Sequence, residues 1–135
     1  MGEWIGTLRG LDVQRAQAFR TLDVATLDKV YVPGSAPWQS DRALLASYRK
    51  QRIRIHDLQI QIDKATITKE TPTTVILRTT DHLAAGRAVD ATGASTPLPP
   101  GTPTTRLITL TTSPPPGTPG KRRPLTWRIA TITPA

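Results

Sequence analysis

Asp81 and His82 are adjacent in the sequence and bring together a carboxylate and an imidazole, groups that commonly move protons in enzymes. Both belong to the segment Val75 to about Leu83, which follows a turn and is predicted to be a strand, and neighbouring strand residues point to opposite faces. The two side chains therefore cannot contact each other, and only one can point inward: Asp81 if Val75 and Leu77 do, or His82 if Ile76 does. Either residue is a candidate catalytic acid or base. The alternative, which the pattern favours, is a pair of ordinary polar residues at a strand end.

The other histidine, His56, precedes Asp57 at a point where the alternation changes phase. Polar groups at such irregularities commonly bind backbone groups that the ladder leaves free, so we expect a structural role for both residues. The chain has no cysteine, and its two histidines show no His-x-x-x-His or Glu-x-x-His spacing. Nucleophile-elbow and phosphate-binding glycine patterns are also missing. We therefore predict no metal site and no cofactor.

The aromatic residues Tyr31, Trp38 and Tyr48 fall on or between the second and third predicted helices. An aromatic wall with a polar tip suits a small apolar ligand, which makes these residues candidate ligand contacts. Packing in the core is the alternative, because large aromatic residues at helical spacing are usually buried.

The formal charge of +8 favours acidic partners such as nucleic acid, anionic lipid headgroups or acidic polymers. The basic residues are mostly scattered, with two local groups: Arg49-Lys50 with Arg52 and Arg54, and Lys121-Arg122-Arg123. The second group is a candidate contact for an anionic partner, and a solvated linker is the alternative. Only Trp127 lies near it, so the group lacks the stacking surface of a single-strand binder. The sequence therefore disfavours nucleic acid.

Length and composition indicate one domain, because 135 residues of which 37% are hydrophobic suffice for a single modest core. No apolar stretch is long enough to cross a bilayer, and the N-terminus lacks the order of a signal peptide. Helical residues follow Met1-Gly2 directly, which indicates a piece of a longer protein whose membrane anchor or targeting segment would lie outside it. The absence of cysteine leaves the compartment open.

The N-terminal part of the chain predicts three short helices. In the first, apolar residues recur at helical steps, at positions Trp4, Leu8, Leu11, Ala18, Phe19 and Leu22. Asp23 is the expected N-cap of a second helix, which ends at Pro33-Gly34. Ser40 or Asp41 is the expected N-cap of a third helix.

Alternating apolar residues after position 52 predict four antiparallel strands, at 58–69, 75–83, 105–112 and 125–133. The phase slip at His56-Asp57 predicts a bulge, and Thr71-Pro72-Thr73 predicts a hairpin turn. Residues 84–104 are expected to form a long loop, and proline- and glycine-rich loops are expected at 97–103 and 114–124. The sequence therefore predicts an α+β fold in a single domain, 1–135, with three N-terminal helices packed in a strongly curved, mainly four-stranded antiparallel sheet.

Four segments resemble the nuclear-transport-factor-2-like, or SnoaL-like, family of cone-shaped folds: Leu11-Asp12-Val-Gln-Arg15-Ala16-Gln-Ala18-Phe19, Asp23 to Leu27, Val30-Tyr31-Val-Pro33-Gly34-Ser35 and Leu125-Thr-Trp127-Arg128-Ile129. The similarity is to a bacterial branch, often of unassigned function, whose domain ends a longer chain behind a membrane anchor or proline-rich linker. The resemblance implies a conical pocket between the helices and the sheet, into which enzymatic relatives project an Asp or His that moves a proton. It also implies an extracytoplasmic or membrane-anchored protein and, because many relatives pair through the outer sheet face, a homodimer as one arrangement.

Several functions fit these observations. The leading hypothesis is a non-catalytic module that binds a small apolar ligand or a protein partner as an appended domain of a larger bacterial protein, because the scaffold lacks a complete catalytic set. The first alternative is a SnoaL-like isomerase, cyclase or hydratase with one acid or base in the cone. The second alternative is an electrostatic binder of nucleic acid or an anionic surface.

Overall fold

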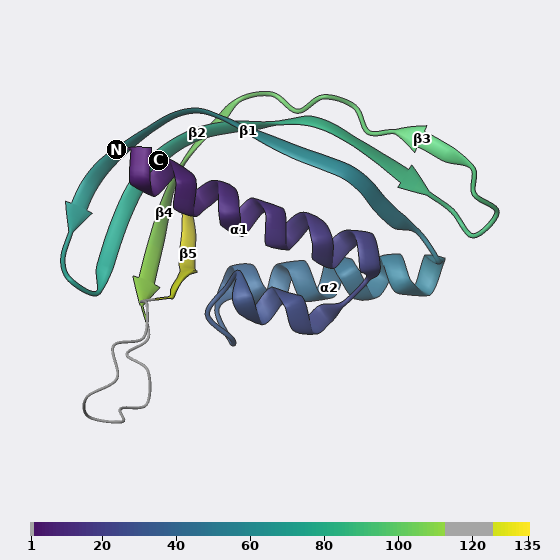
Figure 1. Cartoon of the computed structure of the whole chain (residues 1–135), viewed down its shortest axis with the longest axis horizontal. Coiled ribbons are helices and arrows are strands. Elements are labelled where there is room, and N and C mark those ends of the chain that lie inside the picture. The colour runs from purple at the N-terminus through teal and green to yellow at the C-terminus, as the bar shows by residue number, and fades with distance from the viewer. Residues whose placement is uncertain (1, 113–125) are drawn as a thin grey trace.

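The computed structural model describes residues 2–112 and 126–135, which form an α+β fold with helices before a curved, open antiparallel sheet (Figure 1). The helical part consists of α1 (Gly2–Thr21), the short 3-10 helix η1 (Val24–Lys29) and α2 (Ala36–Gln51). The strands are β1 (Arg54–Glu70), β2 (Thr74–Val89), β3 (Ser95–Pro97), β4 (Thr104–Thr112) and β5 (Trp127–Pro134). The predicted α+β class and the predicted order of helices and strands are confirmed.

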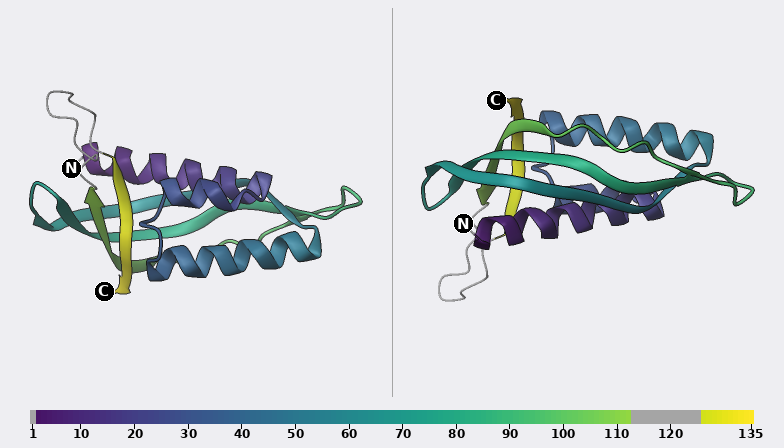
Figure 2. Two further views of the ribbon diagram at one scale, coloured as in Figure 1. Left: turned by 90° about the horizontal axis from the view of Figure 1, so that it is seen from below. Right: turned by 90° about the horizontal axis from the view of Figure 1, so that it is seen from above.

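The sheet has the order β1-β2-β4-β5, with β3 added to β2, and all of these pairs are antiparallel. β1 and β2 form a long hairpin that arches over α1 and α2 (Figure 1). Viewed from the helical side, α1 and α2 run along the two sides of the arch, and β5 crosses one end of it (Figure 2). The concave face of the sheet therefore looks toward the space between the two helices.

α1 buries the apolar stripe that the sequence indicates, at positions Trp4, Leu8, Leu11, Ala18 and Phe19. The predicted cap after it is also confirmed, because Asp23 Oδ1 accepts a hydrogen bond of 3.0 Å from the backbone N–H of Ala25. The helix that Asp23 caps is a single short 3-10 segment, η1, rather than an α-helix.

α2 begins at Ala36, so the prediction that Ser40 or Asp41 caps this helix is wrong. Pro37 lies in the first turn, where its fixed φ suits the helix and its missing N–H costs nothing. Ser35 takes the N-cap position. Asp41 consequently lies inside the helix and is buried, with its carboxylate free to bind side chains instead of backbone N–H groups.

The hairpin and its irregularity agree with the sequence analysis. The Thr71 N–H donates to the Thr74 carbonyl over 2.8 Å and closes the turn between β1 and β2. The pairing register slips between His56 and Gln59, and Asp57 has a φ of 54°, in the left-handed region. The predicted bulge at His56-Asp57 is therefore confirmed.

The long loop predicted for residues 84–104 is wrong in its first half. β2 continues to Val89, and the chain then turns back between Asp90 and Gly93 to pair as β3. Gly86 permits the continuation, because a Cβ at this position would lie 2.9 Å from Cδ1 of Leu98. Glycine usually weakens a strand, but here its missing side chain leaves room for Leu98 to pack against β2. Residues 98–103 lie outside helices and strands, in line with the predicted loop.

The segment that follows η1 joins the edge of β5. The Val32 N–H donates to the Ile129 carbonyl over 2.9 Å, and the Ile129 N–H donates to the Val30 carbonyl over 2.8 Å. Tyr31 lies between these two bonds in a parallel bridge with Ile129, and it is only 4% exposed. The backbone therefore fixes the direction of the Tyr31 side chain.

The C-terminal half differs from the prediction in one further respect. The sheet has five strands, because β3 joins the mainly four-stranded arrangement that the sequence predicts. The connector 114–124 and the basic run Lys121-Arg122-Arg123 lie outside the described residues. No helix in the described part of the chain is long and apolar enough to span a bilayer.

Candidate functional site

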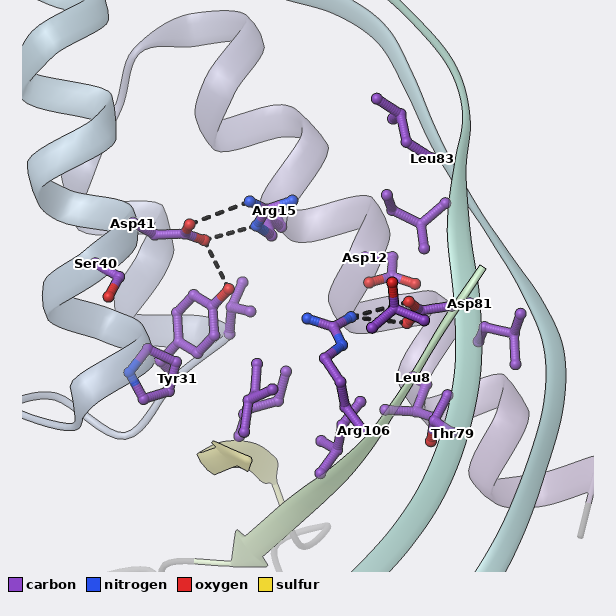
Figure 3. Close-up of a pocket in the computed structure, with 18 of the residues that line it drawn as sticks. Leu8, Asp12, Arg15, Tyr31, Ser40, Asp41, Thr79, Asp81, Leu83 and Arg106 are labelled. Carbon is purple, nitrogen blue, oxygen red and sulfur yellow. Dashed lines mark hydrogen bonds and ion pairs between the residues drawn. The ribbon is translucent and has the colours of Figure 1, made fainter. Parts of the chain in front are cut away.

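A cavity of about 550 Å³, here called the central cavity, lies between α1, α2 and the concave face of the sheet. Its aliphatic lining includes Leu8, Ile60, Ile62, Ile108, Ile129 and Ile132. Its polar lining includes Asp12, Arg15, Tyr31, Asp41, Asp81 and Arg106, most of which Figure 3 labels. Such a mixture of apolar walls and a few converging polar groups is typical of small-molecule sites.

Asp41 of α2 joins two other elements across one side of the cavity (Figure 3). Its carboxylate accepts hydrogen bonds from Arg15 of α1, with Nε at 2.6 Å and Nη2 at 3.1 Å. It also accepts a hydrogen bond of 2.6 Å from the hydroxyl of Tyr31. Burial raises the pKa of Tyr31, so the hydroxyl stays protonated as a donor. Burial would lower the pKa of Arg15, but its hydrogen bond to Asp41 and the charge of Asp41 outweigh burial and raise it.

Asp81 of β2 and Arg106 of β4 form an ion pair on the opposite side of the cavity (Figure 3). Nη2 of Arg106 donates to both carboxylate oxygens, at 2.9 and 3.0 Å. Asp81 faces inward because it shares the buried face of β2 with Val75 and Leu77, which is one of the two alternatives left open by the sequence. Nε of Arg106 is buried without a hydrogen-bond partner among the described residues.

Asp12 of α1 lies beside Asp81 (Figure 3), and its pKa is raised from 3.8 to about 6. Burial is the largest cause and the negative charge of Asp81 adds to it, whereas Arg15 and Arg106 oppose the rise. None of the described residues donates a hydrogen bond to its carboxyl group. Asp12 therefore exchanges a proton near neutral pH and is free to bind a donor from a ligand.

The two residues of the candidate pair Asp81-His82 lie in different environments. Nδ1 of His82 is 2.7 Å from Oδ2 of Asp63 on the neighbouring strand β1, and no hydrogen bond joins the ring to Asp81. Both residues line the central cavity, and Figure 3 shows Asp81 pointing toward Arg106. The structure thus brings Asp81 together with Asp12 and Arg106 instead of with His82.

Of the three candidate aromatic residues, Tyr31 lines the central cavity and the other two do not. Nε1 of Trp38 donates to Asp28 over 2.7 Å, and the guanidinium of Arg42 lies over its ring at 4.3 Å. Tyr48 packs edge-on against Phe19 in the core, with ring centroids 6.0 Å apart. Trp38 and Tyr48 therefore have structural contacts that account for them.

Asp12, Arg15, Asp41 and Arg106 are site residues that the sequence did not predict. A signal was present for Arg15, which lies four residues after Leu11 and four before Phe19, so a helix places it on the apolar stripe. Asp12 follows Leu8 by the same interval. A charged residue at such a position is buried unless the helix bends away, and a buried charge needs a partner. Asp41 and Arg106 carried no comparable signal.

No group of three or more His, Cys, Asp or Glu side chains in residues 2–112 and 126–135 is arranged to hold a metal ion. The central cavity offers hydrogen-bonding groups, two ion pairs and the carboxyl group of Asp12. A scan against models of known protein families found no match, and a search of curated proteins found no relative.

Proposed function

We propose that this chain is a binding module whose central cavity holds a small molecule with an aliphatic body and a hydrogen-bonding head. The proposal rests on polar groups that lack partners within the described residues. Nε of Arg106 and Oγ1 of Thr79 are buried without a hydrogen bond, and the carboxyl group of Asp12 near them also accepts none. Buried polar groups are normally satisfied, because an unpaired one costs about 1–3 kcal/mol. A ligand with matching groups would supply the missing partners.

The charges in the cavity favour a neutral head group. The charges of Arg15 and Asp41 cancel, and so do those of Arg106 and Asp81. Among the acidic and arginine side chains that line the cavity in the described residues, Asp12 is then the one whose charge has no partner. A carboxylate or phosphate would be repelled by that charge whenever Asp12 is ionised. A primary amide fits better, since its N–H group can donate to Asp12 while its carbonyl accepts from Arg106. The isoleucine walls then take the aliphatic body.

Cyclohexanecarboxamide is a suitable probe, and we expect it to bind with a dissociation constant of about 1 mM, as befits so small a ligand. Ser40 borders the cavity and is exposed, so Ser40→Trp should obstruct the site with little effect on folding. Saturation-transfer NMR should show binding to the wild type and at least about a fivefold weaker signal for Ser40→Trp, because the indole occupies the space of the probe.

Ser47→Trp is the matched control, because Ser47 is an exposed residue of the same helix that does not line the central cavity. This variant should bind the amide as the wild type does. Equal weakening by both tryptophans would show that the probe binds elsewhere. No detectable transfer to the wild type at 10 mM amide, roughly ten times the expected constant, would contradict the proposal.

We place the chain among the nuclear-transport-factor-2-like, or SnoaL-like, cone folds as part of the same proposal. The order of helices before strands supports this assignment. So do the long curved hairpin and the cavity on its concave side, which correspond to the pocket expected of that family. Binding without catalysis, as an appended domain of a larger bacterial protein, is then the role that the unpartnered polar groups support best.

An acid–base enzyme is the second candidate, and the raised pKa of Asp12 favours it. A general base works best when its pKa lies near the working pH, and about 6 is close to that range. Asp12 would take a proton from the carbon next to a carbonyl group, while Nε of Arg106 would donate to the carbonyl oxygen. Asp81, paired with Arg106, would hold the guanidinium in place.

Hydrogen–deuterium exchange of cyclohexanone in D₂O separates this candidate from simple binding. If Asp12 acts as a base, the enzyme should speed exchange at the carbon next to the carbonyl above the buffer rate. The rate should rise as Asp12 loses its proton around pH 6. It should fall to the buffer rate in Asp12→Asn, which cannot accept the proton. Exchange at the buffer rate with the wild-type protein would exclude this candidate for simple ketones and leave binding as the function.

A further inference from the structure

At one end of the molecule α2 passes into β1 (Figure 1). A second hollow, of about 540 Å³, is lined by residues from this end. Four basic or ionisable side chains from consecutive elements line it: Arg49, Arg52, Arg54 and His56. We call this site the basic hollow. Its other wall comes from Leu22 after α1, from Val89 at the end of β2, and from Asp90, Ala91 and Gly93 after that strand. The basic hollow is separate from the central cavity and shares none of its lining residues.

The arginines of the basic hollow have no acidic partner in the described part of the chain. None of Arg49, Arg52 and Arg54 lies within ion-pair distance of a carboxylate there. Asp90 is the acidic residue in the wall, and its carboxylate, which accepts hydrogen bonds from the backbone N–H groups of Thr92 and Ala94, offsets one of the three guanidinium charges. The described lining of the hollow therefore keeps a net positive charge.

Arg52 occupies a backbone position that costs stability. It follows α2 with φ 56° and ψ 41°, the left-handed conformation that glycine or asparagine adopts most easily at a helix end. Leu22 takes the same left-handed conformation after α1, with a φ of 57°, so this backbone marks the ends of both helices. What marks the hollow as a site is the convergence of three guanidinium groups and His56 on it.

Interaction with the helix dipole does not account for the whole group. Arg49 lies in the last turn of α2, where a cation is favourable. The carbonyls of Arg49 and Tyr48, however, already accept hydrogen bonds from the backbone N–H groups of Arg52 and Ile53. Arg54 belongs to β1 and not to the helix. The convergence of these side chains on one hollow thus needs another explanation.

We propose that the basic hollow binds the phosphate group of a small phosphorylated molecule. Guanidinium groups pair with phosphate oxygens through two parallel hydrogen bonds, and several arginines around one point suit a doubly charged anion. Apolar Leu22, Val89 and Ala91 in the same hollow can contact the organic part of such a molecule. The convergence on one hollow favours a compact ligand over an extended polyanion, which would follow a stripe of charge.

Inorganic pyrophosphate is the probe, titrated into the whole chain by calorimetry at 50 mM NaCl and again at 150 mM NaCl. The variant with Arg49→Gln, Arg52→Gln and Arg54→Gln should bind at least about tenfold more weakly than the wild type, because the hydrogen bonds to the phosphate are lost. The matched control carries Arg9→Gln, Lys64→Gln and Arg78→Gln, three exposed residues outside the hollow. It loses the same charge and should change affinity by only about twofold.

Arg52→Gly separates loss of binding from loss of folding. This variant removes one guanidinium from the hollow and also relieves the left-handed conformation at the end of α2. We expect about threefold weaker pyrophosphate binding together with a higher midpoint of urea unfolding. Weaker binding combined with higher stability cannot result from a misfolded protein. Unchanged pyrophosphate affinity in Arg52→Gly would count against the site.

Other outcomes would overturn the proposal. If both triple variants bind pyrophosphate equally weakly, the net charge of the protein alone attracts it. Absence of pyrophosphate binding at 50 mM NaCl would exclude the site. Two further probes test other sources of phosphate: vesicles that contain phosphatidylglycerol, and, in a separate experiment, a short DNA duplex. Binding of either one through the three arginines, without binding of free pyrophosphate, would replace a small phosphorylated ligand by a membrane or a nucleic acid.

Discussion

Replacing Asp41 with alanine should lower the free energy of unfolding by about 3 kcal/mol. Asp41 accepts hydrogen bonds from both Arg15 and Tyr31, and it joins α1 to α2 across the central cavity. Its removal leaves a guanidinium and a hydroxyl group without their acceptor. The side chain of Arg15 is 26% exposed, so water recovers part of the loss, and we place the effect at the lower end of the range for broken buried pairs.

Urea unfolding of Asp41→Ala, of Asp41→Asn and of Asp63→Ala tests this prediction. Asp41→Asn keeps one acceptor oxygen and should lose about half as much stability as alanine. Asp63 pairs with His82 on a more exposed part of the sheet, so its replacement should cost only about 0.5 kcal/mol. Similar losses for Asp41→Ala and Asp63→Ala would show that the contact across the cavity does not hold the two helices together.

Replacing Asp12 with asparagine should raise the free energy of unfolding by about 2 kcal/mol at pH 8 and have little effect near pH 4. The folded-state pKa of about 6 lies above the ordinary value of 3.8, so the folded protein binds the proton more tightly than the unfolded chain does. Below about pH 4 the protonated Asp12 costs the folded state nothing. As the pH rises through 6, Asp12 loses its proton in the folded protein and the free energy of unfolding falls. A shift of this size corresponds to about 3 kcal/mol, which we reduce because Asp12 is partly exposed.

The measurement is the difference in unfolding free energy between Asp12→Asn and the wild type at several pH values from 4 to 8. The difference should grow with pH and level off above 7. Glu3→Gln removes an exposed carboxylate from the first turn of the same helix and controls for the change in net charge. A constant difference across the pH range would show that Asp12 gains or loses stability by packing alone.

Much of the fold could be predicted because the spacing of apolar residues along the sequence follows the face of each helix or strand that is buried. The run Val75-Ile76-Leu77 predicted a strand but left its inner face open, because Ile76 is apolar as well; in the structure Val75 and Leu77 are the fully buried pair. The change of phase near Asp57 gave the bulge for the same reason. The prediction failed for residues 84–89, where the glycine content indicated a loop but contacts with a later segment support a strand. Gly86 weakens a strand in isolation, yet here it makes room for Leu98, a contact between segments that no local pattern reveals.

The candidate site was harder to predict than the fold. Alternation could show that only one of Asp81 and His82 faces inward, but it could not show which. The partner of Asp81, Arg106, comes from another strand, and their meeting depends on the register of β2 and β4. Asp41 appeared to be a helix cap, because an Asp near a predicted helix start commonly caps it. Its true neighbours, Arg15 and Tyr31, are brought to it by tertiary packing. Contacts of this kind have no signature in one sequence.

The polar groups of the central cavity are costly for a domain of this size. Charged pairs in a cavity stabilise a fold no better than well-packed apolar residues of similar volume. Asp12 adds a carboxyl group that destabilises the folded state at neutral pH through its own raised pKa. Groups that cost stability without an evident structural return are expected at functional sites. This cost is the physical reason for assigning a ligand to the cavity.

Direct titration of the Asp12 carboxyl group by carbon-13 NMR tests the central claim, that α1 presents this side chain to a poorly hydrated cavity beside Asp81. The account predicts a pKa of about 6 in the wild type. The pKa should fall when Asp81→Asn removes the neighbouring negative charge. A wild-type pKa near 3.8, unchanged by Asp81→Asn, would place Asp12 in water and contradict the cavity and the functions proposed for it.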